Sequence, residues 1–309
     1  SFKWANLASH NAGVIVVVVG MSRTPPNARR YFTLGEGGCP IERQVDNIGP
    51  YLVPSHDIIV NKKQQPNPSL KKMVLGNQPY EGGYLFLEDA MPDIEVEKFT
   101  KYVIGSSEFI RGGVRKCLWI TDDVLVDALK LSEISTRVSK VKTWRQNRNR
   151  AGTRALAARP HQFCEMNIGR ESAIIVPIRS SERREYLPVG LIGSDTVVTN
   201  LAYVIYDALL HNFAVICSKL HLTWISTVCG KLKTDYSYSN KMGWNTFPVP
   251  KLTETDKANL TRCAEDILLA REAHFPATIA ELYDPEKMPD DLRAAHDRND
   301  ETLERIYIG

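Results

Sequence analysis

Hydrophobic residues recur along this chain at two spacings, which separate strand-rich segments from helical ones. An apolar run at 14–19 lies between two glycines and has the length of a buried strand. After Pro50, short apolar stretches alternate with turns rich in Gly, Pro and Asn, which is typical of strands. The strands expected there are 57–61, 84–87, 117–121, 173–178 and 186–192.

Helical spacing is found in three further regions, about 124–158, about 208–228 and the segment after 250. The apolar stripe of 208–228 is expected to be core. A helix-start signal, Thr253-Glu-Thr-Asp256, opens the last region, and residues 282–289 break it before helix resumes over 290–306. These patterns predict an α+β fold, in which a mixed, strand-rich domain with packed helices precedes a helical C-terminal region.

The amino-acid composition is consistent with this α+β prediction. The 309 residues are 24% charged and 43% hydrophobic, as in ordinary globular proteins. The six cysteines are scattered without C-x-x-C spacing, which argues against a zinc ribbon or disulfide framework and favours the cytoplasm. No apolar run has the length of a membrane span, and no signal peptide is recognisable. The chain opens at Ser1 without an initiator methionine, as a piece of a longer polypeptide would.

Charge is distributed unevenly behind a net charge of +3. Residues 137–184 hold twelve Lys or Arg against three acids, whereas residues 251–309 hold eight against fourteen. A concentrated basic block on a nearly neutral chain is the footprint of a polyanion-binding protein. A solvated basic helix face would give the same count, so both interpretations stay open.

The segment 230–250 contains the most specific candidate for a binding site. Lys233 and Asp235 are two residues apart, so on an extended backbone they would face the same way. Lysine donates to guanine and aspartate accepts from cytosine, so the pair suits one G·C base-pair edge. A solvated charge pair at a sheet edge is the alternative. The helix at 208–228 leads directly into this segment and would give it a rigid support.

A second candidate is the loop between the strands expected at 173–178 and 186–192. It presents Arg179, Arg183 and Arg184 beside two serines, a set that suits phosphate groups. A solubilising turn is the alternative. Trp144, among the basic residues of the 124–158 helix, is expected to be a packing anchor.

Catalytic and metal-binding patterns are not found in the sequence. The glycines around Gly35 do not follow a convincing cofactor strand, and Pro25-Pro26 lacks the flanking groups of an amino-methylating loop. Glu97 adjoins Lys98, so the carboxylate spacing of a metal-dependent nuclease fails. His161 is expected to be structural. We therefore predict no catalytic residue and no metal site.

Specific phrases in a fixed order make the chain resemble the C-terminal portion of the MmeI-like family of combined restriction-modification enzymes, which are adenine-specific DNA methyltransferases using S-adenosylmethionine. The phrases run almost from end to end of the chain. They include Met73-Val-Leu-Gly-Asn-Gln-Pro79, Ser180-Ser-Glu-Arg-Arg-Glu-Tyr186, Tyr236-Ser-Tyr-Ser-Asn240 and Leu282-Tyr-Asp-Pro285.

The resemblance implies a domain order and a role. Residues 1–45 would end the methyltransferase domain, 46–250 would form the DNA target recognition domain, and 251–309 would form a helical C-terminal region. The partners would be double-stranded DNA and the upstream methyltransferase domain, with no membrane. The S-adenosylmethionine and catalytic motifs would lie upstream of Ser1, so this fragment would hold no cofactor and be inactive alone.

The resemblance also distributes roles among the candidate residues. Lys233 and Asp235 would read one G·C pair, and the residues after them would shape the loop or touch the DNA backbone: Tyr236, Ser237, Tyr238, Ser239 and Asn240. The arginines expected to bind phosphates are Arg145, Arg148, Arg150, Arg154, Arg179, Arg183 and Arg184. Two alternatives remain, a self-contained methyltransferase with a degenerate cofactor site near Gly35, and a protein-interaction scaffold that docks a partner through its acidic tail.

Overall fold

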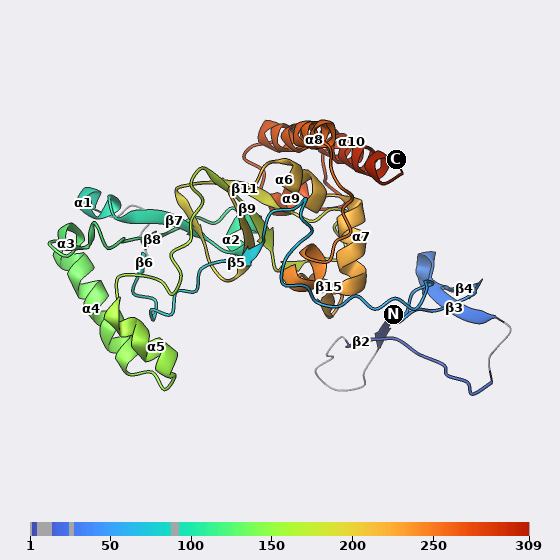
Figure 1. Cartoon of the computed structure of the whole chain (residues 1–309), viewed down its shortest axis with the longest axis horizontal. Coiled ribbons are helices and arrows are strands. Elements are labelled where there is room, and N and C mark those ends of the chain that lie inside the picture. Colours follow the sequence, from blue (N-terminus) through green and yellow to red (C-terminus); the bar gives the residue numbers. More distant parts are fainter. Residues whose placement is uncertain (1, 5–13, 25–27, 88–92, 309) are drawn as a thin grey trace.

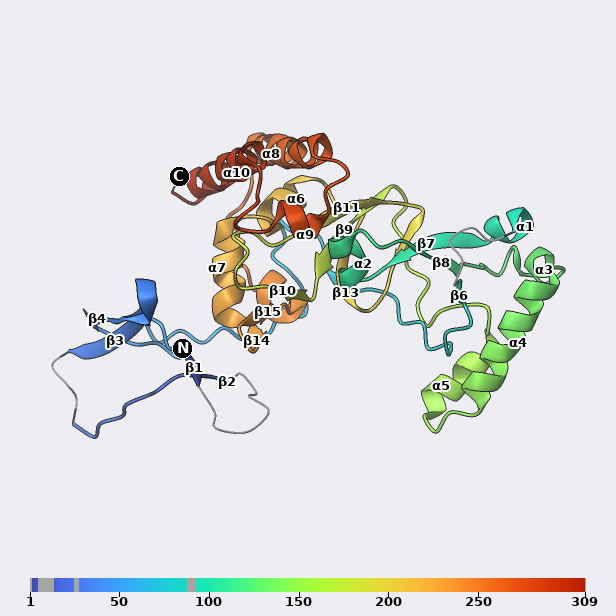
Figure 2. The same ribbon diagram turned by 180° about the vertical axis from the view of Figure 1, so that it is seen from behind.

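The computed structural model describes residues 2–4, 14–24, 28–87 and 93–308. The molecule is elongated, and three parts follow one another along its longest axis (Figure 1). We call them the N-terminal segment (described residues up to 45), the central body (69–77, 106–111 and 169–308, without 196–198) and the distal lobe (the described residues of 78–105 and 112–168, with 196–198). The view from behind gives the same order of parts (Figure 2).

The distal lobe is built on a four-stranded sheet in the order β12-β7-β8-β6, in which only the β12–β7 pair is parallel. Helices cover the sheet and bury a core around Val103, Leu118 and Ile134. Its elements are β6 (Phe86–Leu87), α1 (Ile94–Glu97), β7 (Thr100–Ile104), β8 (Arg115–Leu118), α3 (Leu125–Ala128), α4 (Ser132–Gln146), α5 (Ala151–Ala155), the 3-10 turn η2 (Leu156–Ala158) and β12 (Thr196–Val198).

Helix α4 packs against the rest of the distal lobe through one largely apolar face. Its buried positions are Ile134, Val138, Val141 and Arg145, which lie on one face at helical spacing. The helical region predicted at 124–158 is confirmed, although breaks at 129–131 and 147–150 divide it.

The central body is built on a second four-stranded sheet, in the order β11-β9-β13-β5. Strand β9 is flanked by β11 and β13, both antiparallel to it, and its residues from Ala173 to Pro177 are buried. Its elements before the C-terminal helices are β5 (Val74–Leu75), α2 (Ser106–Arg111), β9 (Ser172–Pro177), β10 (Arg179–Ser180), β11 (Gly190–Gly193), β13 (Ala202–Tyr206), α6 (His211–Ile216), α7 (Lys219–Val228), β14 (Gly230–Leu232), β15 (Asp235–Ser237) and the π-helical turn η3 (Asn240–Trp244).

The C-terminal helices belong to the same hydrophobic core as the central sheet. Helices α8 (Glu254–Ala273), α9 (Ile279–Leu282) and α10 (Asp290–Ile308) place Leu260 and Leu292 in one cluster with Ile174 and Phe213. The predicted start of α8 is confirmed, because Thr253 and Asp256 form a reciprocal capping box.

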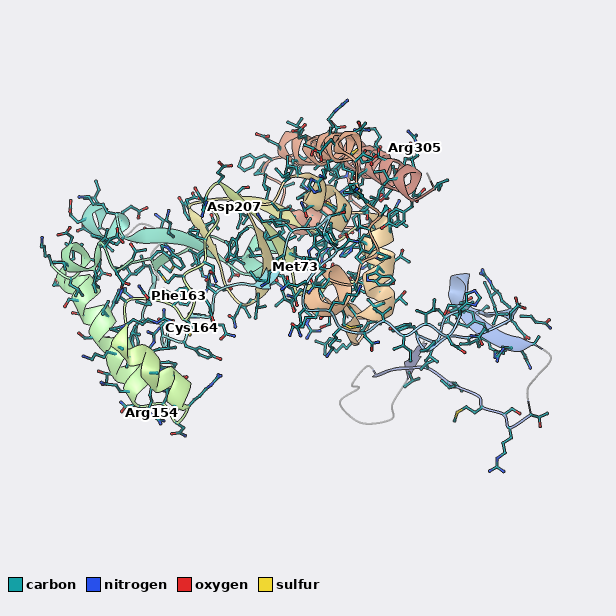
Figure 3. All side chains as sticks on the ribbon, in the orientation of Figure 1. Met73, Arg154, Phe163, Cys164, Asp207 and Arg305 are labelled. Carbon is teal, nitrogen blue, oxygen red and sulfur yellow. The ribbon has the colours of Figure 1, made fainter. Side chains whose placement is uncertain are left out.

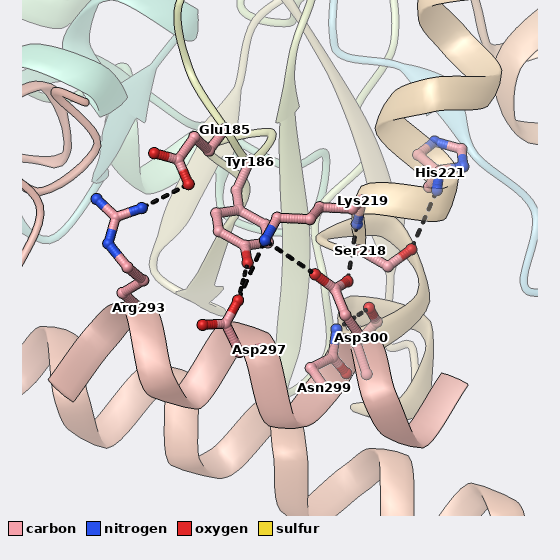
Figure 4. A network of polar contacts seen from close by, with 10 residues as sticks. Glu185, Tyr186, Ser218, Lys219, His221, Arg293, Asp297, Asn299 and Asp300 are labelled. Carbon is pink, nitrogen blue, oxygen red and sulfur yellow. Dashed lines mark hydrogen bonds and ion pairs between the residues drawn. The ribbon is translucent and has the colours of Figure 1, made fainter. Parts of the chain in front are cut away.

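Polar contacts reinforce this joint between the sheet side and α10 (Figure 4). The Tyr186 hydroxyl donates to Asp297 at 2.9 Å, and the Lys219 ammonium lies 3.1 Å from the same carboxylate. The backbone N–H of Lys219 donates to Asp300 at 2.8 Å. The C-terminal region is therefore packed and bonded as part of the central body.

A buried asparagine ties the distal lobe to the central body. The Asn77 side chain donates to the carbonyls of Asn167 and Val198 and accepts from the Asn167 N–H at 2.8 Å. Gly76 beside it leaves no room for a Cβ, which would lie 2.2 Å from the Thr199 carbonyl oxygen. The phrase Met73–Pro79 thus has a structural role at the junction of the two parts.

The N-terminal segment contains two antiparallel pairs and extends away from the central body (Figure 1). Its strands are β1 (Phe2–Trp4), β2 (Val14–Val16), β3 (Arg29–Leu34) and β4 (Pro40–Val45). The segment Gly35–Cys39 joins β3 to β4. The prediction of a buried strand at 14–19 is wrong for its second half, since Val17, Val18 and Val19 are all more than half exposed.

Two other strand predictions need correction. Residues 57–61 form no strand, and Ile58 and Ile59 are largely exposed. The strand expected at 186–192 begins only at Gly190, because Tyr186 and Leu187 are buried in the core that contains the C-terminal helices. No described helix combines the length and hydrophobicity needed to cross a membrane.

Candidate nucleic-acid interface

Lys233 and Asp235 lie on a short hairpin that follows helix α7 and projects from the central body. Strands β14 and β15 pair antiparallel with Leu232 opposite Asp235, so Lys233 and Thr234 form a two-residue turn. Lys233 has a φ of 57°, as hairpin turns of this length require at one or both positions. The expected extended backbone through both residues is therefore wrong. Lys233 and Asp235 are nevertheless both exposed, so both side chains can meet a partner.

The residues that follow anchor the hairpin in the core. Tyr238 is buried, and its hydroxyl lies 2.9 Å from Nε2 of His221 on α7. Burial lowers the pKa of His221 to about 3, so the imidazole is neutral at physiological pH. The Asn240 side chain donates to the Met73 carbonyl at 2.9 Å, and Ser239 caps the turn η3. Tyr238, Ser239 and Asn240 therefore hold the base of the hairpin in place.

The arginine loop is part of the same small sheet as the hairpin. Strand β10 pairs with β15, with Arg179 opposite Ser237 and Ser180 opposite Tyr236, so the sheet order is β10-β15-β14. Two regions about fifty residues apart in the sequence are thereby brought together. Tyr236 and Ser237 are half-buried in the middle strand, so the sheet joins the two candidate sites through Tyr236 and Ser237.

The three arginines of this loop differ in their surroundings. Arg179 is exposed, and Arg183 is exposed but paired with Glu286 of the C-terminal region at 2.7 Å. Arg184 is half-buried. Burial lowers its pKa, while the nearby carboxylates of Asp235 and Asp284 act in the opposite direction. Arg179 and Arg183 can thus reach a phosphate at the surface, whereas Arg184 faces two carboxylates of the protein.

Arg145 does not belong to a phosphate site, and this part of the prediction is wrong. The side chain is fully buried, and its guanidinium donates to five backbone carbonyls. They belong to Pro79, Tyr80, Leu156, Arg159 and Gln162. Because these bonds engage the N–H groups of the guanidinium, Arg145 fixes the loops around α4.

The other predicted arginines of this region are exposed on the distal lobe. The Arg148 guanidinium lies 4.2 Å from the Trp144 ring centre, and Arg154 donates to the Arg148 carbonyl at 2.9 Å. Arg150 lies 6.0 Å from the Tyr80 ring. Trp144 is half-buried against Gly82, where a Cβ would lie 2.7 Å from the indole ring. Trp144 therefore packs against Gly82 and contacts a cation, but it is not among the described members of the distal-lobe core, so the expected core role is not confirmed.

Basic and acidic elements lie on different sides of the molecule. In Figures 1 and 2, the β14–β15 hairpin and the α4–α5 pair lie toward the lower edge, whereas α8 and α10 lie along the upper edge. Figure 3 places Arg154 at the lower end of the distal lobe and Arg305 on the C-terminal helices, far from it. A long polyanion could therefore contact the hairpin and the distal lobe without passing over the acidic helices.

Sequence reasoning missed the exposed polar face of α4. Thr136, Lys140, Thr143 and Asn147 line a groove beside the loop that contains Tyr84. Their spacing of four, three and four residues is a helical stripe that is legible in the sequence. Among the described residues, no group of three or more His, Cys, Asp and Glu side chains is placed to hold a metal ion.

The α+β fold agrees with the comparisons to known proteins, and the chain belongs to the MmeI family. The family model of the MmeI target recognition domain matches residues 54–251, and that of the MmeI C-terminal domain matches residues 252–309.

One curated relative is DNA methyltransferase A of Bacillus subtilis (strain 168), which is 39% identical over 313 residues, covering 99% of this chain and 35% of that protein. A solved structure of the Type IIL restriction-modification enzyme MmeI in complex with DNA matches with a TM-score of 0.88 and 29% identity. That match covers 99% of this chain and 42% of the MmeI chain. The chain thus spans about two fifths or less of the length of these relatives.

Proposed function

We propose that this chain is the sequence-specific, double-stranded DNA recognition module of an S-adenosylmethionine-dependent adenine-N6 DNA methyltransferase in a restriction-modification system. The observation that carries the proposal is the sheet β10-β15-β14. It joins an exposed hairpin bearing Lys233 and Asp235 to a loop of arginines. A module that reads bases needs both parts, because phosphate contacts fix its register on the duplex and base contacts carry the sequence information.

In this proposal Lys233 and Asp235 read one G·C pair, with the ammonium donating to guanine and the carboxylate accepting from cytosine. The hairpin projects on a two-residue turn, which suits insertion into the major groove, and a two-stranded ribbon fits that groove. Tyr236, Ser237, Tyr238, Ser239 and Asn240 shape and support it.

Phosphate contacts in the proposal come from both ends of the molecule. Arg179 and Arg183 lie beside the hairpin, and Arg148, Arg150 and Arg154 lie on the distal lobe. Arg184 is less suited to bind a phosphate, because the carboxylates of Asp235 and Asp284 already act on its guanidinium. DNA carries negative charge along its whole length, so the two clusters would fix the duplex at separate points.

Catalysis and cofactor binding are assigned to other parts of the polypeptide. The glycines at 35, 37 and 38 join two antiparallel strands of a hairpin, and they do not lead from a strand into a helix as a cofactor loop would. These residues do not fit an S-adenosylmethionine site. We assign residues 1–45 to the end of the methyltransferase domain, 46–250 to the recognition domain and 251–309 to the C-terminal region. The exposed Val17, Val18 and Val19 support a neighbouring domain before residue 46. The six free cysteines support a cytoplasmic location.

The proposal is tested by measuring which DNA sequence the full polypeptide recognises, with and without substitutions in the hairpin. Lys233→Ala with Asp235→Ala should change the preference at one base pair by about 1–3 kcal/mol, and leave the other positions of the site as they were. Lys231→Ala is the control, because Lys231 is exposed on the same hairpin but stacks over Tyr236 at 5.4 Å. Mapping of methylated sites would reveal the change. An unchanged site in the double variant would refute the base-reading assignment.

A further inference from the structure

The exposed face of α4 forms a groove in which Arg148 is the only residue already proposed above to bind phosphate. We call it the α4 groove and define it by Thr136, Lys140, Thr143, Trp144, Asn147 and Arg148, with Tyr84 on its opposite wall. It encloses about 580 Å³. The groove is on the distal lobe, whose core is separate from the core beneath the β14–β15 hairpin.

The groove lies along the polar face of α4, opposite the face that is buried in the distal lobe. Thr136, Lys140, Thr143 and Asn147 form one stripe, and Ile134, Val138, Val141 and Arg145 form the buried stripe on the opposite face. The exposed stripe runs over twelve residues from Thr136 to Asn147, and its eleven rises of about 1.5 Å make it about 16 Å long. One strand of B-DNA advances 3.4 Å per nucleotide along the axis, so the stripe matches about four to five nucleotides.

The chemistry of the groove is that of a hydrogen-bond donor surface with positive charge. Its described lining contains hydroxyls, one amide, Lys140 and Arg148, and no carboxylate. Among the described residues, neither Lys140 nor Arg148 forms an ion pair. By contrast, Arg137 on the same helix is bonded to Glu133 and to the carbonyl of Tyr84.

Each of the two cations lies near an aromatic ring that also lines the groove. Lys140 Nζ lies 6.0 Å from the Tyr84 ring centre, and the Arg148 guanidinium lies 4.2 Å from that of Trp144. Such contacts restrain long side chains and leave their outer N–H groups available to a ligand. A phosphate that enters the groove would therefore meet cations that are already partly positioned.

We propose that the α4 groove binds the sugar-phosphate backbone of DNA outside the base pairs that the hairpin reads. This inference rests on the proposed function and extends it. The distal lobe would be a second DNA-binding site, which contacts the flanking duplex independently of its sequence. A backbone strand fits the groove better than base edges do, because the groove offers charge and hydroxyl donors along a line. Base readout would need paired donors and acceptors at fixed positions.

The experiment compares two double variants of the full polypeptide that remove the same charge from the same lobe. Lys140→Ala with Arg148→Ala empties the groove of cations. Lys98→Ala with Lys130→Ala is the matched control, since both lysines are exposed and lie in local ion pairs outside the groove. Binding to duplexes with a central recognition site and long or short flanks is measured over a range of salt concentrations. Thermal unfolding verifies that each variant is folded.

The groove variant should lose about 30-fold in affinity at 0.15 M salt, and the slope of log K against log salt should fall by about 1.8. The loss should disappear on duplexes whose flanks are too short to reach the distal lobe. Discrimination between the correct site and a single mismatch should not change. An equal loss in the control variant, or an unchanged slope in the groove variant, would overturn the proposal while leaving the proposed function intact. If the unmodified protein binds no duplex in a salt-dependent way, the proposed function fails and the groove proposal fails with it.

Discussion

Ser180 lies directly opposite Tyr236 in the antiparallel pair of β10 and β15. This pairing fixes the arginine loop beside the β14–β15 hairpin, although β11, β12, β13, α6 and α7 separate the two segments in the sequence. A contact made by Arg179 therefore constrains where Lys233 and Asp235 can lie on the same duplex.

Replacement of the buried Arg145 should destabilise the distal lobe without a direct effect on charge at the surface. Arg145→Met removes a fully buried guanidinium and leaves five carbonyl acceptors without their donor, so the free energy of unfolding should fall by about 3 kcal/mol or more. Arg154→Met, at an exposed position of α5, should change it by less than about 0.5 kcal/mol. Denaturant unfolding of the two variants measures the difference, and similar losses would contradict a structural role for Arg145.

The C-terminal region should be required for folding of the recognition domain. Leu292 of α10 is fully buried in the core shared with the central sheet, so Leu292→Ala should cost about 2–5 kcal/mol. Leu269→Ala on α8 should be nearly neutral, because that side chain is 63% exposed. Chemical denaturation followed by a probe in the central body, such as Trp224, is the measurement. An unfolding midpoint of the central body that does not respond to Leu292→Ala would show that the two regions fold independently.

Release of Arg183 should strengthen sequence-independent DNA binding. The Arg183–Glu286 pair is exposed on both sides and contributes at most about 1 kcal/mol, so Glu286→Gln should raise affinity for non-specific DNA by up to about fivefold. Asp266→Asn removes the same charge from the exposed Arg298–Asp266 pair and serves as the control. Titration of both variants with a duplex that lacks the recognition site gives the comparison. The prediction fails if the control gains as much affinity as Glu286→Gln.

His221 should make stability depend on acid pH. Its pKa is lowered to about 3 by burial, against an ordinary value of 6.5, so below pH 6.5 the unfolded state binds a proton that the folded state does not. Stability should therefore fall as the pH drops from 6.5 toward 3, by about 5 kcal/mol in total from this group. In His221→Gln this contribution should be absent. His56→Gln, at an exposed position, is the matched control. The measurement is the unfolding free energy of each variant between pH 4 and 7. If wild type and His221→Gln lose stability in parallel as the pH falls, His221 is not the cause of the acid sensitivity.

The sequence contains enough information to predict the helical regions. The helices at 124–158, 208–228 and 254–306 follow from apolar spacing, and the capping box at Thr253 marks the start of α8 within one residue. Sheet order does not follow from local pattern. The parallel pairing of β12 with β7 and the pairing of β13 with β5 depend on contacts between residues about a hundred or more positions apart.

The candidate site was predicted less completely, for two physical reasons. The turn at Lys233-Thr234 lacks the Gly or Asn that usually marks a two-residue hairpin, so an extended backbone was the natural expectation. Arg145 continues the buried stripe of Ile134, Val138 and Val141, a signal that was present in the spacing. It was overlooked because arginine is seldom fully buried, and because the carbonyls that satisfy it come from loops whose positions the sequence does not reveal.

In the proposed function, the two-residue turn of the β14–β15 hairpin separates the residues that read DNA from those that keep the protein folded. Leu232, Lys233 and Asp235 are all exposed, and the core resumes only at Tyr238. Substitutions at the tip therefore cost little folding free energy, whereas the supporting residues tolerate few changes. Under the proposed function, new binding preferences can therefore arise by substitutions at Lys233 and Asp235, without compensating changes elsewhere in the chain.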